Sequence, residues 1–190
     1  MNGGIVTHNL SKTYPGAAEA ALSKLNLQVE PREVYGFLGA NGAGKTTAIR
    51  LLLNFIQPTS GSAAVNGLDI VKDSVAVKRH VGYLAGDIAL WPKVTGQQLF
   101  DYLMQLQGKD CTPYLQELVK KFEAEPQKKI GELSKGNRQK IGIIQALMHQ
   151  PDVLIMDEPT SGLDPLMQEV FYAEVRAAAH RGAAVLVSSH

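Results

Sequence analysis

A glycine-rich segment in the first quarter of the chain carries the residues best suited to chemistry. It reads Gly39-Ala40-Asn41-Gly42-Ala43-Gly44-Lys45-Thr46-Thr47 and fits the pattern G-x-x-x-x-G-K-[ST]. Glycines let the backbone wrap around a phosphate without side-chain clashes, and consecutive N–H groups at a helix start face the anion. We expect Lys45 to reach the β- and γ-phosphates of a nucleotide, the Thr46 hydroxyl to bind Mg²⁺, and Thr47 to contact the α-phosphate. A glycine-rich turn with an incidental lysine is the alternative, and the strand-like and helix-like flanks disfavour it.

Two adjacent acids supply the second half of such a site. Residues 152–157 (DVLIMD) form an apolar run that ends in Asp157, as expected for a strand buried on both faces. We expect Asp157 to hold Mg²⁺ directly or through water. Glu158 follows, where a carboxylate can accept a proton from an attacking water or orient it. A solvated strand end is the alternative, but the phosphate loop needs an acidic partner.

The elements around these residues predict an α/β fold. Strand-like segments occur at 5–10, 25–30, 33–38, 62–65, 81–85, 152–157 and 183–189. Helical periodicity or capping signals occur at 45–54, from Thr95 to Gly108, from Pro113, from Ser134, and from Asp164 to Arg181. This alternation predicts a mainly parallel core sheet, with an N-terminal antiparallel β region. We treat residues 1–190 as one domain, with a core at 1–86 and 151–190 and a small helical insert at 87–150.

Composition limits the classes of partner and location. Nineteen basic and eighteen acidic residues give a formal charge of +1, so no nucleic acid partner is expected. The single cysteine, Cys111, excludes an internal disulfide. The sequence has neither a signal peptide nor an apolar run of about 20 residues that could span a bilayer. We therefore expect a cytoplasmic protein that reaches a membrane only through a partner.

Further segments carry a family resemblance. Leu133-Ser134-Lys135-Gly136-Asn137 resembles the LSGGQ signature of ABC transporter nucleotide-binding domains, with Lys135 and Asn137 as departures. Ser161-Gly162-Leu163-Asp164 resembles the D-loop of that family, and His190 resembles its switch histidine. Tyr14 resembles the aromatic residue that stacks on adenine. The sequence is thus similar to the P-loop NTPase fold of ABC transporters over nearly its whole length.

This resemblance implies an ATP-binding and ATP-hydrolysing motor subunit of a membrane transporter. Two copies, identical or different, would pair head to tail, with ATP between the phosphate loop of one copy and Ser134 and Gly136 of the other. The D-loop residue Asp164 would border the same nucleotide. Glu158 would be the general base, and His190 would contact the γ-phosphate. A separate integral membrane permease would hold the subunit at the cytoplasmic face of the membrane. Because family members continue beyond the last strand, we expect a C-terminally truncated chain.

One departure from the family concerns the loop after strand 81–85. Gly86 stands where the family has a glutamine that helps to hold magnesium. Asp87 either replaces this glutamine as an oxygen ligand acting through water or only caps the following turn. The Gly-Asp form resembles subfamilies that drive ABC-2-type exporters of drugs and other small molecules. Trp91 follows, and it either docks against the membrane subunit together with Leu90 or packs the insert against the sheet.

Two other functions remain as alternatives. A soluble ABC-type ATPase in translation or DNA maintenance would lack a permease, but its usual coiled coil or second cassette is not found here. A nucleotide-binding module with little hydrolysis would fit the missing glutamine, whereas Lys45, Asp157 and Glu158 argue for an active ATPase.

Overall fold

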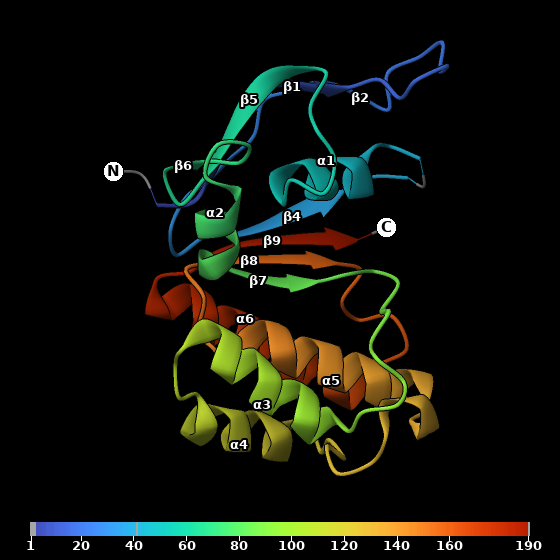
Figure 1. The fold of residues 1–190 in the computed structure, drawn as a ribbon, viewed down its shortest axis with the longest axis vertical. Helices are drawn as coiled ribbons and strands as arrows, with labels where there is room; N and C mark the ends of the chain where they lie inside the picture. The colour runs from blue at the N-terminus through green and yellow to red at the C-terminus, as the bar shows by residue number, and fades with distance from the viewer. Residues whose placement is uncertain (1–2, 41, 190) are drawn as a thin grey trace.

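The computed structural model describes residues 3–40 and 42–189. In that part of the chain, two β-sheets and two groups of helices form a layered α/β fold (Figure 1). Two of the predicted site residues, Asn41 and His190, lie outside the described residues.

A parallel sheet forms the centre of the fold, with the strand order β4-β9-β8-β7. Its strands are β4 (Val34–Leu38), β7 (Val81–Leu84), β8 (Val153–Asp157) and β9 (Ala184–Ser189). Strand β8 is buried along its whole length. Its side chains alternate between two hydrophobic cores, Leu154 and Met156 in one and Val153 and Ile155 in the other. The predicted parallel core sheet is therefore confirmed.

Parallel pairing also positions the predicted chemistry. Strand β8 ends at Asp157 and β4 ends at Leu38, just before the phosphate loop. The carboxyl ends of parallel strands meet at one edge of a sheet, where α/β proteins bind their ligands. The acids and the phosphate loop, far apart in sequence, therefore lie at the same edge.

The second sheet is antiparallel, as predicted, with the order β2-β1-β5-β6 and with β3 also paired to β1. Its strands are β1 (Ile5–Lys12), β2 (Leu22–Leu25), β3 (Gln28–Val29), β5 (Ser60–Val65) and β6 (Leu68–Asp69). The prediction of a single strand at 25–30 is wrong, because the pairing with β1 is interrupted between β2 and β3. The Thr7 hydroxyl lies at the break: it donates to the Leu25 carbonyl at 2.9 Å and accepts from the Leu27 N–H at 2.8 Å.

Most helices begin and end at the predicted signals. They are α1 (Lys45–Leu52), α2 (Ser74–His80), α3 (Gly96–Gln107), α4 (Thr112–Lys121), α5 (Lys135–Leu147) and α6 (Pro165–Arg181), with a 3-10 turn η1 at Ile130–Glu132. Thr95 and Gln98 form a capping box at the start of α3, and Gly108 ends that helix with a φ of 63°. Helix α2 is missing from the sequence prediction because it buries only Val77 and so has no apolar stripe. No helix within 3–40 or 42–189 has the length and apolar character needed to cross a bilayer.

The helices cover the parallel sheet in layers (Figure 1). Helix α1 packs on one face, between the parallel and antiparallel sheets, and its buried residues share a core with both. Helices α5 and α6 lie against the opposite face, and α3 and α4 lie beyond them. Because α5 touches β7 as well as α3 and α4, it connects the helical layer to the sheet. The division into a core and an insert at 87–150 stays a prediction.

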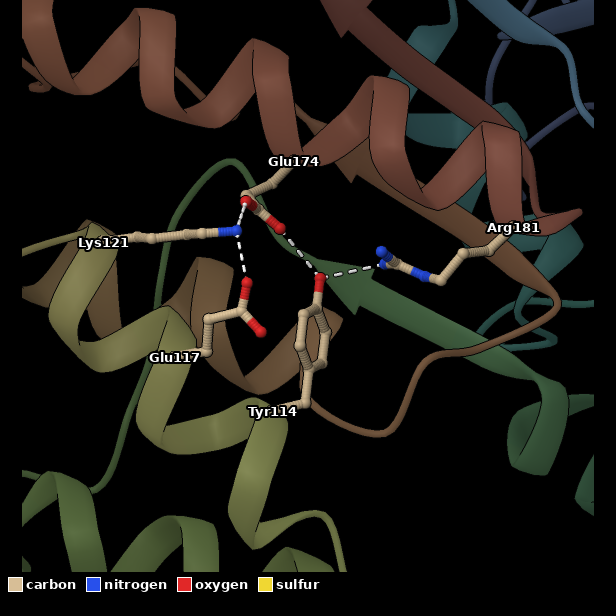
Figure 2. A network of polar contacts seen from close by, with 5 residues as sticks. All are labelled: Tyr114, Glu117, Lys121, Glu174 and Arg181. Atoms are coloured by element: carbon tan, nitrogen blue, oxygen red, sulfur yellow. Dashed lines mark hydrogen bonds and ion pairs between the residues drawn. The ribbon is translucent and has the colours of Figure 1, made fainter.

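A polar network fastens α4 to α6 (Figure 2). Glu174 of α6 is buried and accepts hydrogen bonds from the Tyr114 hydroxyl at 2.9 Å and from Lys121 Nζ at 2.5 Å. Arg181 donates to the same Tyr114 hydroxyl at 2.9 Å and lies over its ring. Burial, followed by the bond to Glu174, raises the pKa of Tyr114 to about 12, so its hydroxyl remains a donor at neutral pH. Tyr114 and Lys121 both lie on α4, so the buried carboxylate of Glu174 joins α4 to α6 through two hydrogen bonds.

His149 lies just after α5, and we expect its buried imidazole to make the stability of the fold decrease at acid pH. The side chain is buried, and its Nε2 has no hydrogen-bond partner within the described residues. Burial lowers the pKa of His149 below its ordinary 6.5. Below about pH 6.5 the unfolded chain then binds more protons than the folded one, so the free energy of unfolding falls as the pH falls.

We expect the His149→Phe variant to lose this part of the pH dependence. Urea unfolding at about pH 7.5 and about pH 5.5 measures it, since the wild-type midpoint should drop more on acidification than the midpoint of the variant. The comparison between two pH values cancels any constant packing effect of phenylalanine. Equal drops for both proteins would show that His149 does not make folding acid-sensitive.

Candidate functional site

The phosphate loop leaves β4 and enters α1, as predicted. Gly42 and Gly44 have φ values of 83° and 87°, in the left-handed region that favours glycine. Gly44 also lacks room for a side chain, because a Cβ there would lie 2.5 Å from the carbonyl oxygen of Ala21. The glycines thus allow the turn, and the free N–H groups of the first turn of α1 lie at its end.

A cavity of about 300 Å³ lies over this loop, and we call it the phosphate cavity. Its lining residues are Ala21, Ala40, Gly42, Ala43, Gly44, Lys45, Thr46, Thr47 and Glu158. Lys45 is 7% exposed, and its ammonium donates to the carbonyl of Gly39 and, at 3.1 Å, to the carbonyl of Ala40. Since an ammonium has three donors, one remains available to an anion in the cavity. The described residues of the predicted phosphate site therefore come together.

The predicted metal-binding residues Thr46 and Asp157 also meet. The Thr46 hydroxyl donates to Oδ2 of Asp157 at 2.9 Å, which links the start of α1 to the end of β8. The other carboxylate oxygen of Asp157 accepts from the hydroxyl of Ser188 on β9. Asp157 is 5% exposed, so these bonds replace most of its contact with water. The carboxylate is thereby held in one orientation at the floor of the site.

The donor set at this point suits a hard divalent cation. A hydroxyl and a carboxylate offer oxygen atoms, which Mg²⁺ prefers, whereas zinc and copper favour thiolate and imidazole. In the described part of the chain, no three His, Cys, Asp or Glu side chains cluster closely enough to hold a metal by themselves. Mg²⁺ needs only a few protein ligands, because it keeps several waters and also binds substrate phosphates.

Glu158 lines the phosphate cavity next to Asp157. Its φ of 47° lies in the left-handed region, which is unusual for a glutamate. Its N–H donates to the Ser188 hydroxyl at 3.2 Å, and its carbonyl accepts from the Ser161 N–H at 3.2 Å. Such a conformation costs about 1–3 kcal/mol, and seven other non-glycine residues of the described chain also have a positive φ, among them Glu123.

The loop after β7 approaches the same acid. A Cβ on Gly86 would lie 3.4 Å from Oδ2 of Asp157, so the backbone of this loop borders the predicted metal site. Asp87 is exposed beside it. Turn capping by Asp87 requires a following backbone N–H that donates a hydrogen bond to its carboxylate, and none does so within residues 3–40 and 42–189. The ligand alternative for Asp87 stays a prediction.

The predicted signature and D-loop residues begin helices. Ser134 caps α5 by accepting from the Asn137 N–H at 3.2 Å, and Asp164 caps α6 by accepting from the Met167 N–H at 3.0 Å. Gly136 lies in the first turn of α5. Residues 133–137 do not contribute to the lining of the phosphate cavity in the described structure. Within one copy, the two predicted anion sites are therefore separate.

Tyr14 lies in the loop that follows β1. Its ring is half-buried and lies 5.5 Å from the ammonium of Lys12. The same loop leads to Ala21, which lines the phosphate cavity. Tyr14 therefore belongs to a segment that borders the cavity, and its contact with adenine stays a prediction.

Sequence analysis missed Ser188 as a functional residue. Ser188 is fully buried and pairs in register with Asp157 across β8 and β9. It bonds both the Asp157 carboxylate and the backbone of Glu158. A serine at the end of an otherwise apolar strand was the available signal, but its partner becomes visible only when the strands are paired.

Comparison with known proteins places the site in a family. The sequence matches the ABC transporter family over residues 22–161. The chain belongs to the ABC transporter family. NatA of Bacillus subtilis (strain 168), an ABC transporter ATP-binding protein, is 35% identical over 90% of this chain and 72% of NatA. The bacitracin transport ATP-binding protein BcrA of Bacillus licheniformis is 34% identical over 98% of this chain, which spans 61% of BcrA.

Solved structures of ABC proteins share the fold. An ATP-binding subunit of an ABC transporter superposes with a TM-score of 0.91 at 26% identity, over 98% of this chain and 79% of that one. MJ0796, a bacterial ABC transporter cassette solved as a dimer, gives a TM-score of 0.88 at 23% identity, over 98% and 88% of the two chains. The predicted P-loop NTPase fold is thereby confirmed. The ABC family binds ATP and couples its hydrolysis to transport, so the family-level prediction of a transport ATPase is also confirmed.

Proposed function

We propose that this ABC subunit binds Mg-ATP in the phosphate cavity and hydrolyses it to drive a membrane exporter. The observation that carries the proposal is the Thr46–Asp157 hydrogen bond, which joins the phosphate loop to the acids at 2.9 Å. Lys45, Thr46 and Glu158 line the same cavity, and Asp157 adjoins it through its hydrogen bond with Thr46. This is the set of groups that phosphoryl transfer requires.

Each residue has a proposed role in the reaction. The N–H groups of the loop and the Lys45 ammonium bind the β- and γ-phosphates, and Thr47 binds the α-phosphate. Thr46 and Asp157 hold Mg²⁺, with Asp87 as an outer ligand through water. When bound there, Mg²⁺ supplies positive charge that neutralises the phosphate oxygens. Glu158 accepts the proton of the attacking water.

Four further residues have proposed roles that follow the family resemblance. Tyr14 stacks on adenine, and Gly39 and Asn41 contribute backbone to the phosphate loop. His190 contacts the γ-phosphate.

We further propose that two copies, identical or different, complete each site head to tail. In one copy, Ser134 and Gly136 lie outside the phosphate cavity, at the start of α5. A helix N-terminus suits the γ-phosphate of an ATP held by the partner, and Asp164 would border the same nucleotide. MJ0796, a bacterial ABC transporter cassette of the same fold, was solved as a dimer, which supports the pairing of two copies.

A mixing experiment tests shared sites. Lys45→Ala removes the phosphate-binding ammonium, and Ser134→Asp keeps the helix cap but places a negative charge against phosphate. Each variant alone should hydrolyse ATP at background rate. An equal mixture should regain about a quarter of the wild-type rate, because about half of the dimers are mixed and each holds one intact site of two.

The controls separate this arrangement from a site within one copy. If phosphate loop and signature acted together in one chain, the mixture would stay inactive. Ser134→Asn, which also caps α5 but adds no charge, should retain more activity than Ser134→Asp. Activity in the Ser134→Asp variant alone would overturn the proposed contact between Ser134 and phosphate.

The proposed partner is an integral membrane permease at the cytoplasmic face of the membrane, and no nucleic acid partner is proposed. Trp91 is 53% exposed and lies 5.4 Å from the ring of Tyr102 on α3, which is also exposed. Exposed paired aromatic rings are typical of contact surfaces. Trp91 thus packs on the helical layer and stays exposed to solvent. Leu90 is partly buried and packs against the core of the helical layer. A small-molecule substrate is supported by the name of BcrA, a bacitracin transport ATP-binding protein.

A further inference from the structure

Residues in the first two turns of helix α5 form hydrogen bonds to the loop at 158–161, a turn that begins with Glu158. The side-chain amide of Gln139 donates to the carbonyl of Pro159 at 2.7 Å, and Gln139 is 3% exposed. The ammonium of Lys135 donates to the hydroxyl of Ser161 at 3.3 Å. Lys135 and Gln139 are four residues apart on a helix, so they lie on the same face. One face of α5 therefore bonds this turn at two positions, Pro159 and Ser161.

Close backbone packing reinforces the two bonds. A Cβ on Gly136 would lie 2.8 Å from the carbonyl oxygen of Gly162, so the start of α5 touches the D-loop directly. Gly162 has a φ of 81°, and a Cβ on it would meet the aliphatic stem of Lys135 at 3.5 Å. The lysine thus covers the D-loop with its stem and bonds it with its ammonium. A glycine at position 135, as in the LSGGQ form, would provide neither contact.

The turn is also fixed from the side of the sheet. The Glu158 N–H donates to Ser188 of β9, and the Ser161 N–H closes the turn on the Glu158 carbonyl at 3.2 Å. Glu158 has a left-handed φ of 47°, and these hydrogen bonds hold the backbone on either side of it. Strand β9 holds one end of the turn, and α5 holds the rest through Gln139 and Lys135.

We propose that Gln139 and Lys135 are positioning residues for hydrolysis, which hold Glu158 of their own copy in its reactive orientation. The proposal rests on the proposed role of Glu158 as general base. Neither residue lines the phosphate cavity of its own copy, and the proposed contacts with the partner's ATP belong to Ser134 and Gly136, so we expect the loss of Gln139 or Lys135 to lower kcat with little change in nucleotide binding. A misplacement of about 1 Å in a reacting group lowers a rate by about 100-fold.

Steady-state phosphate release and binding of fluorescent trinitrophenyl-ATP test the proposal. Gln139→Leu keeps the apolar body of a buried side chain and removes its donor. We expect its kcat to fall by about 10- to 100-fold, with KM for ATP and nucleotide Kd within about 2-fold of wild type. Lys135→Met keeps the stem over Gly162 and removes the ammonium, and its kcat should fall by about 2- to 10-fold. Lys135→Arg, which keeps a donor, should recover most of that loss.

A matched control lies at the other end of α5. Lys109 donates to the carbonyl of His149 at 2.8 Å, so Lys109→Met removes a comparable bond far from the turn, and its kcat should stay at the wild-type value. Thermal unfolding of each variant confirms that the assay temperature lies below its midpoint. If Gln139→Leu does not fold, the exposed Lys135→Met and Lys135→Arg pair decides the matter.

The outcomes separate this inference from the function on which it rests. Wild-type hydrolysis with an unchanged kcat in Gln139→Leu and Lys135→Met overturns the positioning role alone. A rise in KM and Kd in proportion to the loss of activity also overturns it, because that pattern marks a contact with bound ATP. Absence of Mg-dependent hydrolysis by the wild type overturns the proposed function together with the inference.

Discussion

Lys45→Ala is expected to raise the Kd for Mg-ATP by about 100-fold, since a charge-assisted hydrogen bond to phosphate is worth about 3 kcal/mol. In the structure the ammonium is buried and already bonds the carbonyls of Gly39 and Ala40, so it is directed into the loop. Its third donor is the one that a phosphate oxygen would accept. Isothermal titration calorimetry with magnesium and ATP measures the change directly.

The loss in Lys45→Ala has two sources that calorimetry alone does not separate. The variant loses the bond to phosphate, and it also leaves the loop carbonyls of Gly39 and Ala40 without their donor. Binding of inorganic sulfate or phosphate to the loop, compared with thermal stability in the absence of any anion, distinguishes them. Lys109→Met, which loses a lysine–carbonyl bond outside the site, should bind ATP as the wild type does. Wild-type affinity in Lys45→Ala would refute the phosphate-binding role of the loop.

The features that sequence analysis predicted correctly are encoded over short stretches of chain. The glycines around Lys45 define a left-handed loop by their own conformational freedom. Thr95, Ser134 and Asp164 mark helix starts because a capping side chain bonds an N–H only two or three residues away. The meeting of the phosphate loop with Asp157 was predictable for a different reason, since parallel strands bring their carboxyl ends to one edge.

The features that sequence analysis missed depend on partners that are distant in the chain. Thr7 lies at the break in the strand predicted at 25–30 and makes two bonds across about 20 residues of sequence, and threonine otherwise favours a strand. Ser188 acquires its role only when β9 pairs with β8. Sequence analysis assigned no role to Gln139, and only the folded chain shows its amide on Pro159. Positioning residues of this kind have no local sequence signal.

Glu158→Gln is expected to lower kcat for ATP hydrolysis by about 100- to 10,000-fold, the range that a general base contributes. Glutamine has the same shape and tolerates the φ of 47° no worse than glutamate, so the turn and its bonds to Ser188 and Ser161 should persist. Nucleotide binding should therefore be retained, in contrast to Lys45→Ala. Phosphate release and calorimetry on the same preparation measure both quantities.

Because Glu158→Gln should still bind ATP, the mass of its ATP-bound form provides a second, independent measurement. If two copies enclose ATP, blocking hydrolysis should let the ATP-bound dimer accumulate, and light scattering should report a larger mass with Mg-ATP than without it. Glu169→Gln, which neutralises an exposed acid on α6, should show neither the loss of rate nor the change in mass. Wild-type hydrolysis in Glu158→Gln would remove Glu158 as the base and leave Asp157, held by Thr46 and Ser188, as the acid that carries the chemistry.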